Sequence, residues 1–214
     1  MQRVLDIVLS FCALLALSPL FVLVYCILKM TGEREAFFYQ PRIGKDRKCF
    51  SIIKFATMLK DSPNTSTGTV TIKNDPRVLP VGKVLRKYKI NELPQLINVI
   101  NGTMSLIGPR PLTLQTFNYY PEETKPIICQ VRPGLSGVGS IIFRDEESLM
   151  NNHIDAIKYY SETIAKEKAA LEIWYVKNQS LSLYLKLIIS TILVVVFPKS
   201  KWINHLIPNI PRDQ

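Results

Sequence analysis

Apolar residues fill the start of the chain almost without interruption. The segment from Val4 to Met30 reads VLDIVLSFCALLALSPLFVLVYCILKM. It is too long for the core of a signal peptide and has no convincing cleavage site. A helix rising about 1.5 Å per residue over this segment reaches about 40 Å, and the hydrocarbon layer of a bilayer is about 30 Å thick. The pattern therefore predicts a membrane helix over residues 1–30.

The middle of this segment leaves its topology open. Ser18-Pro19 lies there, and Pro19 cannot donate to the carbonyl of Leu15, so a kink is expected. Basic residues flank both ends, with Arg3 before the segment and Lys29 at its close, so the positive-inside rule gives no clear orientation. A kinked transmembrane helix is one alternative. The other is a re-entrant helix that bends at Ser18-Pro19 and leaves by the face it entered.

The next pattern alternates between strand-like and turn-like residues. Residues 37–55 read FFYQPRIGKDRKCFSIIKF, with Gly44 and Asp46 as turn residues. This predicts a β-hairpin, either simply solvated or forming a basic edge near phosphates. Residues 61–75 are rich in Ser, Thr and Asn and predict a loop, and residues 76–89 predict a short basic helix.

Helical spacing of apolar residues returns in residues 92–101. This spacing predicts a short amphipathic helix, with Asn91 as its N-cap and Gly102 as its C-terminal stop. Pro94 is acceptable there because the first turn has unpaired N–H groups in any case. A Gly-Pro-Arg-Pro turn follows and holds Arg110 between two prolines. Glu92 and Arg110 are thus expected to face each other across a site.

The rest of the chain predicts mainly helices. Residues 140–143 suit a short strand or a buried turn, and residues 145–178 one or two helices. Residues 180–197 begin amphipathic and become strongly apolar, but this part is too short to span a bilayer and suits an interfacial or core-facing helix. The expected fold is α+β and mostly helical: a membrane helix over 1–30, a catalytic domain with a small β-hairpin and amphipathic interfacial helices over 31–197, and a tail over 198–214.

Composition narrows the range of partners. The net charge of +10 suits nucleic acid, an anionic membrane surface or a phosphate-bearing substrate. The basic residues are scattered and no nucleic-acid motif is present, so no nucleic-acid partner is expected. The four cysteines show no CxxC spacing, which argues against a zinc site and a disulfide framework. His153 and His205 are interpreted as surface residues.

Few residues remain as candidates for chemistry. The sequence contains no P-loop, GxGxxG, GxSxG or HExxH motif. Glu92, Arg110 and Arg144 are the best candidates, because phosphoryl transfer needs cations on the moving phosphate and an acid that holds Mg²⁺. Arg110 would clamp phosphate through its guanidinium. An acid in a helix's first turn is also favourable without any function, so a structural role for Glu92 stays open.

Residues 89–111, KINELPQLINVINGTMSLIGPRP, resemble the signature of the bacterial sugar transferases, which are monotopic phosphoglycosyl transferases. The family pattern is Asp-Glu-Leu-Pro-Gln-Leu, then Asn-Val, then Gly-x-Met-Ser-Leu-x-Gly-Pro-Arg-Pro. The resemblance extends over residues 1–197: the family's Gln-x-Arg-x-Gly occurs at 40–44 and its Pro-Gly-x-[Ser/Thr]-Gly at 133–137. Ala56 stands where the family's Lys-Phe-Arg-x-Met has arginine. Residues 138–143 replace a common Trp-Ala-Gln-Val-Asn-Gly before Arg144.

The resemblance implies a reaction, a cofactor and a location. A sugar-1-phosphate would pass from a UDP-sugar to polyprenyl (undecaprenyl) phosphate, with release of UMP, as the first membrane step of surface-glycan synthesis. Glu92 would help to place Mg²⁺, Arg110 and Arg144 would bind substrate phosphate, and Ser18 and Pro19 would form the break of a re-entrant helix. The protein would lie in the bacterial inner membrane with its catalytic part on the cytoplasmic face. Contact with downstream glycosyltransferases or self-association stays open.

One departure concerns the catalytic centre itself. Asn91 stands where the family has the Asp that attacks the phosphate next to the sugar, and an amide is a poor nucleophile. Four interpretations follow: an inactivated variant, a natural homologue that binds without turnover, Glu92 as the nucleophile, or direct attack by the acceptor phosphate with Asn91 orienting groups. A different class is a membrane-bound scaffold that recruits glycan enzymes through a retained nucleotide-sugar fold.

Overall fold

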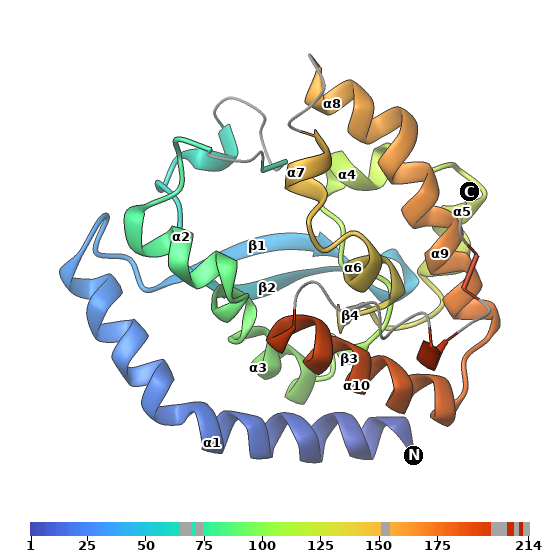
Figure 1. Ribbon diagram of the computed structural model, residues 1–214, viewed down its shortest axis with the longest axis horizontal. Helices are drawn as coiled ribbons and strands as arrows, with labels where there is room; N and C mark the ends of the chain where they lie inside the picture. Colours follow the sequence, from blue (N-terminus) through green and yellow to red (C-terminus); the bar gives the residue numbers. More distant parts are fainter. Residues whose placement is uncertain (65–69, 72–74, 151–154, 198–204, 208–209, 212–214) are drawn as a thin grey trace.

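The computed structural model describes residues 1–64, 70–71, 75–150, 155–197, 205–207 and 210–211. The chain is mostly helical and carries two small two-stranded sheets, as the sequence predicted for an α+β fold. In Figure 1 the long helix α1 (Gln2–Met30) follows one edge of the molecule, and the hairpin crosses its middle. Helices α9 (Ala165–Lys177) and α10 (Leu181–Val196) lie on the opposite side from the C-terminal end of α1.

Helix α1 is long and apolar, as predicted, and carries most of its apolar side chains on the surface. It is the one helix among the described residues that is long and apolar enough to cross a membrane. Pro19 lies inside it, and the hydroxyl of Ser18 donates to the carbonyl of Leu15 over 2.8 Å. Figure 1 shows that the helix changes direction: its first part passes beneath α3 (Gln95–Ile100) and α10, and its second part rises beside α2 (Pro80–Lys87).

Two groups of contacts hold α1 against the rest of the molecule. Near its start, Arg3 donates to the carbonyls of Val99 and Ile100 at the end of α3, over 2.6 and 2.9 Å. Near its end, Val24 and Leu28 are buried in an apolar cluster with residues from the hairpin and α2. Both parts of α1 therefore pack against one body.

The predicted β-hairpin is confirmed. Strands β1 (Phe37–Ile43) and β2 (Cys49–Phe55) pair antiparallel, and a short 3₁₀ turn at Lys45–Arg47 joins them. The side chain of Asn98 on α3 makes two hydrogen bonds with the backbone of β2. Its oxygen accepts from the N–H of Ile53 over 2.9 Å, and its amide group donates to the carbonyl of Ser51 over 2.8 Å. These bonds fix α3 against the hairpin.

The predicted helix over residues 92–101 is shorter than expected. A 3₁₀ turn occupies Ile90–Glu92, and α3 begins only at Gln95, with Pro94 at its N-cap position. Asn91 as N-cap is therefore wrong: it lies buried inside the 3₁₀ turn, and its side-chain oxygen has no hydrogen-bond partner among the described residues. Pro94 lacks a backbone N–H, and at the start of a helix this N–H would have no partner within the helix, so proline is favourable there. Gly102 follows α3 with φ +87°, as its predicted role as a stop requires.

A second, parallel pair of strands was not expected from the sequence. Strand β3 (Ser105–Ile107) pairs with β4 (Gly134–Ser136). Residues 140–143 do not form the predicted strand: residues 140–142 belong to α6 (Val138–Ile142), which begins directly after β4, and Phe143 lies in the turn that follows the helix. Val138 and Ile141 are both buried in the core cluster, and a separation of three residues places them on one face of a helix.

The remaining elements follow the predicted helical pattern closely. The basic helix expected over 76–89 is α2, which starts at Pro80. Residues 145–178 form α7 and then one continuous run through α8, a π-helical turn and α9. Ser180 caps α10 by accepting from the N–H of Leu183 over 3.1 Å. The other short elements are a 3₁₀ turn at Ser62–Asn64, α4 (Leu114–Asn118), α5 (Thr124–Ile128), α7 (Glu146–Met150), α8 (Ala156–Tyr159) and the π turn Tyr160–Ile164.

Three predictions concern segments that are described only in part. The loop expected over 61–75 contains the Ser62–Asn64 turn, but residues 65–69 and 72–74 lie outside the described residues. His205 is exposed, as predicted, whereas His153 lies outside the described residues. In the expected tail over 198–214, Ile207 and Ile210 are buried against α9 and α10 as part of the core cluster.

Candidate active site

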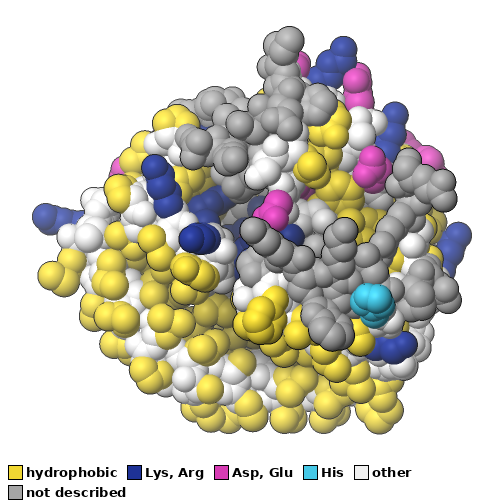
Figure 2. All heavy atoms as spheres, in the orientation of Figure 1, with side chains coloured by type: hydrophobic (Ala, Val, Ile, Leu, Met, Phe, Trp, Pro, Cys, Tyr) yellow, Lys and Arg dark blue, Asp and Glu magenta, His cyan; other side chains and the backbone are white. Residues whose placement is uncertain are grey.

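A cavity of about 1400 Å³ lies between the hairpin, α2, the α6–α7 region and the end of α10. Figure 2 shows basic and acidic side chains close together near the middle of this face, with hydrophobic side chains below and beside them. A cavity of this size exceeds the range of about 300–1,000 Å³ that is usual for small-molecule sites. It therefore has room for two substrates at once.

The centre of the cavity wall is one carboxylate between two cations. Oε1 of Glu92 lies 3.0 Å from Nζ of Lys54 and 3.0 Å from Nη2 of Arg110. Lys54 comes from β2, Glu92 from the 3₁₀ turn and Arg110 from the turn after β3. The three side chains are only 16%, 14% and 28% exposed. Such pairs in a partly dry site interact strongly, and removing one partner leaves a buried charge uncompensated.

A third cation joins this group through the backbone. Nη1 of Arg42 donates to the carbonyl of Pro111 over 2.9 Å, and Nη2 donates to Oε1 of Gln40 over 2.5 Å. Arg42 thereby links β1 to the turn that carries Arg110. Burial and then the charge of Arg110 lower the pKa of Arg42 to about 9. Three cations around Glu92 leave a net positive charge, which attracts an anion.

The turn that carries Arg110 is fixed by very close backbone packing. The N–H of Gly108 donates to the carbonyl of Ser136 over 2.9 Å, and the N–H of Gly134 donates to the carbonyl of Pro109 over 2.8 Å. A Cβ on Gly134 would lie 2.1 Å from the nitrogen of Gly108, so no larger residue fits there. The Gly-Pro-Arg-Pro and Pro-Gly-Leu-Ser-Gly segments therefore form one rigid unit.

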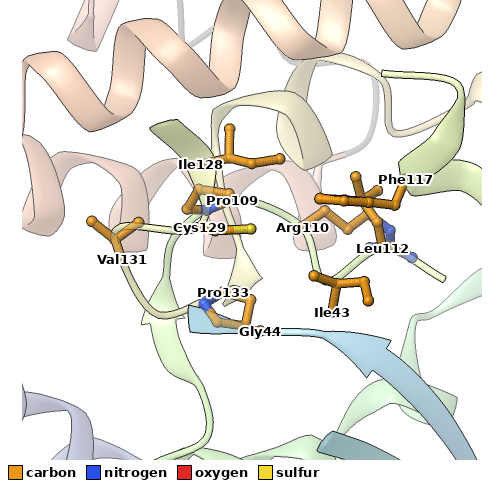
Figure 3. Close-up of a pocket in the computed structure, with 10 residues that line it drawn as sticks. All are labelled: Ile43, Gly44, Pro109, Arg110, Leu112, Phe117, Ile128, Cys129, Val131 and Pro133. Atoms are coloured by element: carbon orange, nitrogen blue, oxygen red, sulfur yellow. The ribbon is translucent and has the colours of Figure 1, made fainter. Parts of the chain in front are cut away.

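The other side of this turn faces an apolar pocket that is too small for a substrate. It holds about 20 Å³, roughly the room for one water. Figure 3 shows that Arg110 is the one charged residue among the ten that line it, with Ile128, Phe117 and Val131 among its neighbours. The large cavity, and not this pocket, is the candidate site.

A buried acid holds Arg110 from behind. Oε1 of Glu172, on α9, accepts from the backbone N–H of Arg110 over 3.3 Å. Glu172 is 1% exposed, and its Oε2 has no partner among the described residues. Oε1 occupies the space left free at Gly139, where a Cβ would lie 2.7 Å away. Burial raises the pKa of Glu172 to about 7.

One turn earlier on α9, Lys168 supports another part of the wall. Its Nζ lies 2.5 Å from Oε2 of Glu146 and over the rings of Phe143 and Tyr160, 5.9 and 5.8 Å from their centres. Lys168 is 2% exposed. Although burial opposes the shift, the charge of Lys168 lowers the pKa of Glu146. The wall next to Arg144 thus rests on a satisfied buried ion pair.

The charges at the centre shift one another's pKa in opposite directions. Burial raises the pKa of Glu92, but the charges of Lys54 and Arg110 outweigh it and hold that pKa well below its ordinary value. Burial lowers the pKa of Lys54 to about 7, with Arg42 and Arg110 adding to the effect and Glu92 opposing it. Glu92 is therefore a stable anion, and Lys54 titrates near neutral pH.

The structure brings some of the predicted site residues together. Glu92 and Arg110 are in contact, as expected. Asn91 and Arg144 line the same cavity, and Nη1 of Arg144 is buried without a hydrogen-bond partner among the described residues. Ser18 and Pro19 lie in α1 and do not contribute to the cavity.

Sequence reasoning missed several residues of this site. Lys54 and Arg42 stood in the segments that resembled the family, at 54–58 and 40–44, so the motifs could have indicated them. Glu146 stands near the start of the helical segment expected over 145–178 and gave no further signal. Lys168 and Glu172 gave no signal, because their role depends on α9 packing behind the Arg110 turn.

Comparison with known proteins identifies the family of this chain. The sequence model of the family described as "Bacterial sugar transferase" matches residues 1–198. The chain is 31% identical to the exopolysaccharide production protein ExoY of Sinorhizobium fredii, over 94% of this chain and 88% of that protein. It is 32% identical to the UDP-glucose:undecaprenyl-phosphate glucose-1-phosphate transferase of Caulobacter vibrioides, over 89% of this chain and 68% of that protein.

A longer relative shares the same region. The chain is 31% identical to an uncharacterized sugar transferase of Haemophilus influenzae over 92% of its own length, but it spans only 41% of that protein. The range matched by the family model, residues 1–198, includes the segments that carry Lys54, Glu92 and Arg110. The chain therefore belongs to the bacterial sugar transferase family.

Proposed function

We propose that this protein transfers a sugar-1-phosphate from a UDP-sugar to polyprenyl phosphate and releases UMP, as an early membrane step of surface-glycan synthesis. The observation that carries the proposal is the Glu92 carboxylate held between Lys54 and Arg110 in a large, positively charged cavity. The name of the Caulobacter vibrioides relative describes this type of transfer.

The cations suit the charge that develops during such a transfer. An oxygen of the acceptor phosphate attacks the phosphorus next to the sugar, and the bond from that phosphorus to the bridging oxygen breaks. UMP leaves with the bridging oxygen, and a polyprenyl-diphosphate sugar forms. Arg110 and Lys54 neutralise the moving phosphoryl group, which is the main task of the protein in phosphoryl transfer. The unpartnered Nη1 of Arg144 offers a further donor to a phosphate oxygen.

The residues fit a Mg²⁺ ion that is shared with the substrate. No group of three or more His, Cys, Asp or Glu side chains among the described residues forms a complete metal site. Mg²⁺ instead binds through one or two protein oxygens, phosphate oxygens and water. Glu92 and Asn91 are adjacent in the chain and both line the cavity, so their side-chain oxygens would hold such an ion. A bound Mg²⁺ would add positive charge to the diphosphate.

We propose direct attack by the acceptor phosphate, without a covalent intermediate on the protein. The amide of Asn91 is a poor nucleophile. Oε1 of Glu92 already accepts from two cations, and its low pKa makes the carboxylate a weak nucleophile. Asn91 would then only orient groups. Mass spectrometry of protein mixed with the UDP-sugar alone is expected to find no phosphosugar adduct, and an adduct on Glu92 would overturn direct attack.

We further propose that α1 enters and leaves the membrane on one face, with its break at Ser18-Pro19. A straight transmembrane helix has its ends on opposite sides of a bilayer about 30 Å thick, whereas both parts of α1 pack against the same body. The hydroxyl of Ser18 supplies a donor to the Leu15 carbonyl, which Pro19 cannot bind. The catalytic part would lie on the cytoplasmic face of the inner membrane. Labelling of residue 1 from outside intact cells would overturn this topology.

A second candidate function rests on Asn91. Without the family's Asp, the chain could retain the fold and bind a nucleotide-sugar while it recruits other glycan enzymes. The retained Glu92, Arg110 and Arg144 speak against this alternative, because an acid for Mg²⁺ and cations for the moving phosphate are what phosphoryl transfer requires.

The deciding experiment is UMP release from a panel of UDP-sugars, including UDP-glucose, with polyprenyl phosphate and Mg²⁺. The unmodified protein in nanodiscs is compared with Glu92→Gln and Asn91→Asp. Release by the unmodified protein that is lost in Glu92→Gln would support the transferase. Release by Asn91→Asp alone would identify an intact framework without its nucleophile. Silence of all three proteins, with nucleotide-sugar binding retained, would support the scaffold.

A further inference from the structure

The large cavity has two chemically different walls. One carries the charged residues around Glu92 and Arg110. The other is apolar and is formed by the last turn of α10 together with residues of β4 and α6. Its apolar members are Leu135, Ile141, Val194, Val195 and Val196. A nucleotide-sugar has no large apolar part that would use this second wall.

The apolar wall continues onto the surface of the molecule. Val195 and Val196 line the cavity and are nevertheless 38% and 59% exposed. Further back on α10, the exposed apolar side chains Leu185, Ile189 and Ile192 precede Val196 at intervals of four, three and four residues, which places them along one helix face. Exposed apolar residues of this kind on α10 and α1 mark a surface for lipid.

The last turn of α10 is also fixed relative to the charged wall. The hydroxyls of Ser136 and Thr191 lie 2.8 Å apart, which ties α10 to β4. The backbone carbonyl of Ser136 accepts a hydrogen bond from the N–H of Gly108, and Gly108 lies two residues before Arg110. Two hydrogen bonds, one from α10 to Ser136 and one from Ser136 to Gly108, therefore connect α10 to the turn that carries Arg110.

We propose that the last turn of α10 guides the isoprenoid tail of the acceptor lipid from the membrane to the cavity. This inference rests on the proposed function, because that function supplies a lipid with a phosphate head. The phosphate must reach the cations around Glu92, whereas the attached tail must stay in apolar surroundings. Val195 and Val196 join these two environments, so the first isoprene units lie against them.

A matched pair of substitutions tests the path through kinetics. Val195→Asp places a charge on the lining of the cavity, and Leu114→Asp places the same charge on an exposed apolar residue of α4, outside both the lining and the apolar face of α10. In nanodiscs we expect Val195→Asp to raise the KM for polyprenyl phosphate about tenfold, since a charge repels apolar tail atoms, with the KM for the UDP-sugar unchanged. Leu114→Asp is expected to leave both values within about twofold. Equal effects of the two substitutions would overturn the proposal.

A turnover-independent measurement separates this proposal from the transferase activity. Polyprenyl phosphate with a photoreactive diazirine on its first isoprene unit is illuminated with the unmodified protein and with Glu92→Gln. Cross-links in the peptide containing residues 194–197 are expected in both. Cross-links confined to α1, or none, would overturn the lipid path even if UMP is released. Cross-links at α10 without UMP release from the unmodified protein would keep the lipid path and contradict the transferase.

Discussion

Two glutamates meet Arg110 from opposite sides, and their surroundings differ. Glu92 accepts from the guanidinium of Arg110 and from Lys54, each over 3.0 Å. Among the described residues, Glu172 accepts only from the backbone N–H of Arg110, over 3.3 Å. Burial raises the pKa of both, but the two cations reverse this for Glu92, whose pKa lies well below its ordinary value. The pKa of Glu172 stays raised, at about 7.

The comparison shows how one arginine serves two purposes. Its side chain belongs to the charged face of the cavity, where Glu92 holds the guanidinium ready for an anion. Its backbone belongs to the packed interior, where a buried acid with a raised pKa and close glycine contacts fix the turn. On the reacting side, a group acts through its charge. On the supporting side, a group acts by fixing the position of the catalytic residue.

The largest expected effect comes from the charged side of the comparison. Glu92→Gln removes the anion that holds Lys54 and Arg110 and that would help to hold Mg²⁺. We expect UMP release to fall by about 10³-fold, in line with the loss of one key electrostatic group. Glu122→Gln is the control, because this acid is 85% exposed and lies outside the cavity. Activity of Glu92→Gln within about threefold of the unmodified protein would contradict the assignment.

The supporting side should respond differently to conservative and severe changes. Glu172→Ala removes the acceptor of the Arg110 N–H, and we expect kcat to fall about 100-fold, since small misplacements of a catalytic group are costly. The KM for the UDP-sugar should change by less than about threefold. Glu172→Gln keeps an acceptor oxygen and should restore most of kcat.

The control for this pair lies on the same helix. Glu167→Ala removes an acid of α9 that does not touch Arg110 and is expected to be silent. If Glu172→Gln is as impaired as Glu172→Ala, Glu172 acts through its charge, and the contrast with Glu92 fails.

The charged side of this comparison could be found from the sequence, and the supporting side could not. Glu92 and Arg110 stood in a continuous motif with a helix and a turn between them, so local pattern was sufficient. The hairpin and α10 likewise followed from local alternation and helical spacing. Glu172 lies 62 residues after Arg110 in the chain, and no local pattern indicates which buried acid meets which backbone N–H.

Two predictions from the sequence were wrong, and both errors arose because local residue preferences did not decide the structure. Asn is a favoured N-cap residue, so Asn91 was expected to start the helix. Pro94 instead occupies the N-cap position, and the helix begins at Gln95. The segment after β4 has the β-branched residues of a strand, yet packing of Val138 and Ile141 against α9 makes it helical. Tertiary contacts decided both cases.

A third buried carboxylate, Asp6, can be compared with Glu92 and Glu172. Asp6 on α1 is 2% exposed and accepts from three neutral donors: the hydroxyl of Ser105 at 2.9–3.0 Å, the N–H of Leu106 at 2.9 Å and the hydroxyl of Tyr184 at 2.8 Å. It thereby joins α1, β3 and α10, and unlike Glu92 it has no cation among these donors.

Asp6→Ala should therefore affect stability more than chemistry. It leaves buried donors unpaired, and we expect a loss of about 2 kcal/mol in the free energy of unfolding, measured by thermal unfolding in detergent. Asp6→Asn keeps one acceptor oxygen and should lose less. Full stability of Asp6→Ala would mean that α1 does not depend on this contact.

The smallest effect concerns pH. Lys54 has a pKa of about 7, lowered mainly by burial, so it is charged below this value and neutral above it. From pH 6 to pH 8 its charged fraction falls from about 90% to about 10%, and a neutral Lys54 attracts a diphosphate less. We expect UDP-sugar affinity to weaken about fivefold over this range, measured by isothermal titration calorimetry.

Lys54→Arg provides the matched control, because arginine stays charged throughout this range. Its affinity should change little between pH 6 and pH 8. Glu172 also titrates near pH 7, but it acts on the backbone of Arg110, so its ionisation should alter kcat rather than affinity. If Lys54→Arg keeps the full pH dependence of binding, the titrating group is not Lys54. Glu172 would then influence the charged face as well, and the division between the reacting and supporting sides of Arg110 would be incomplete.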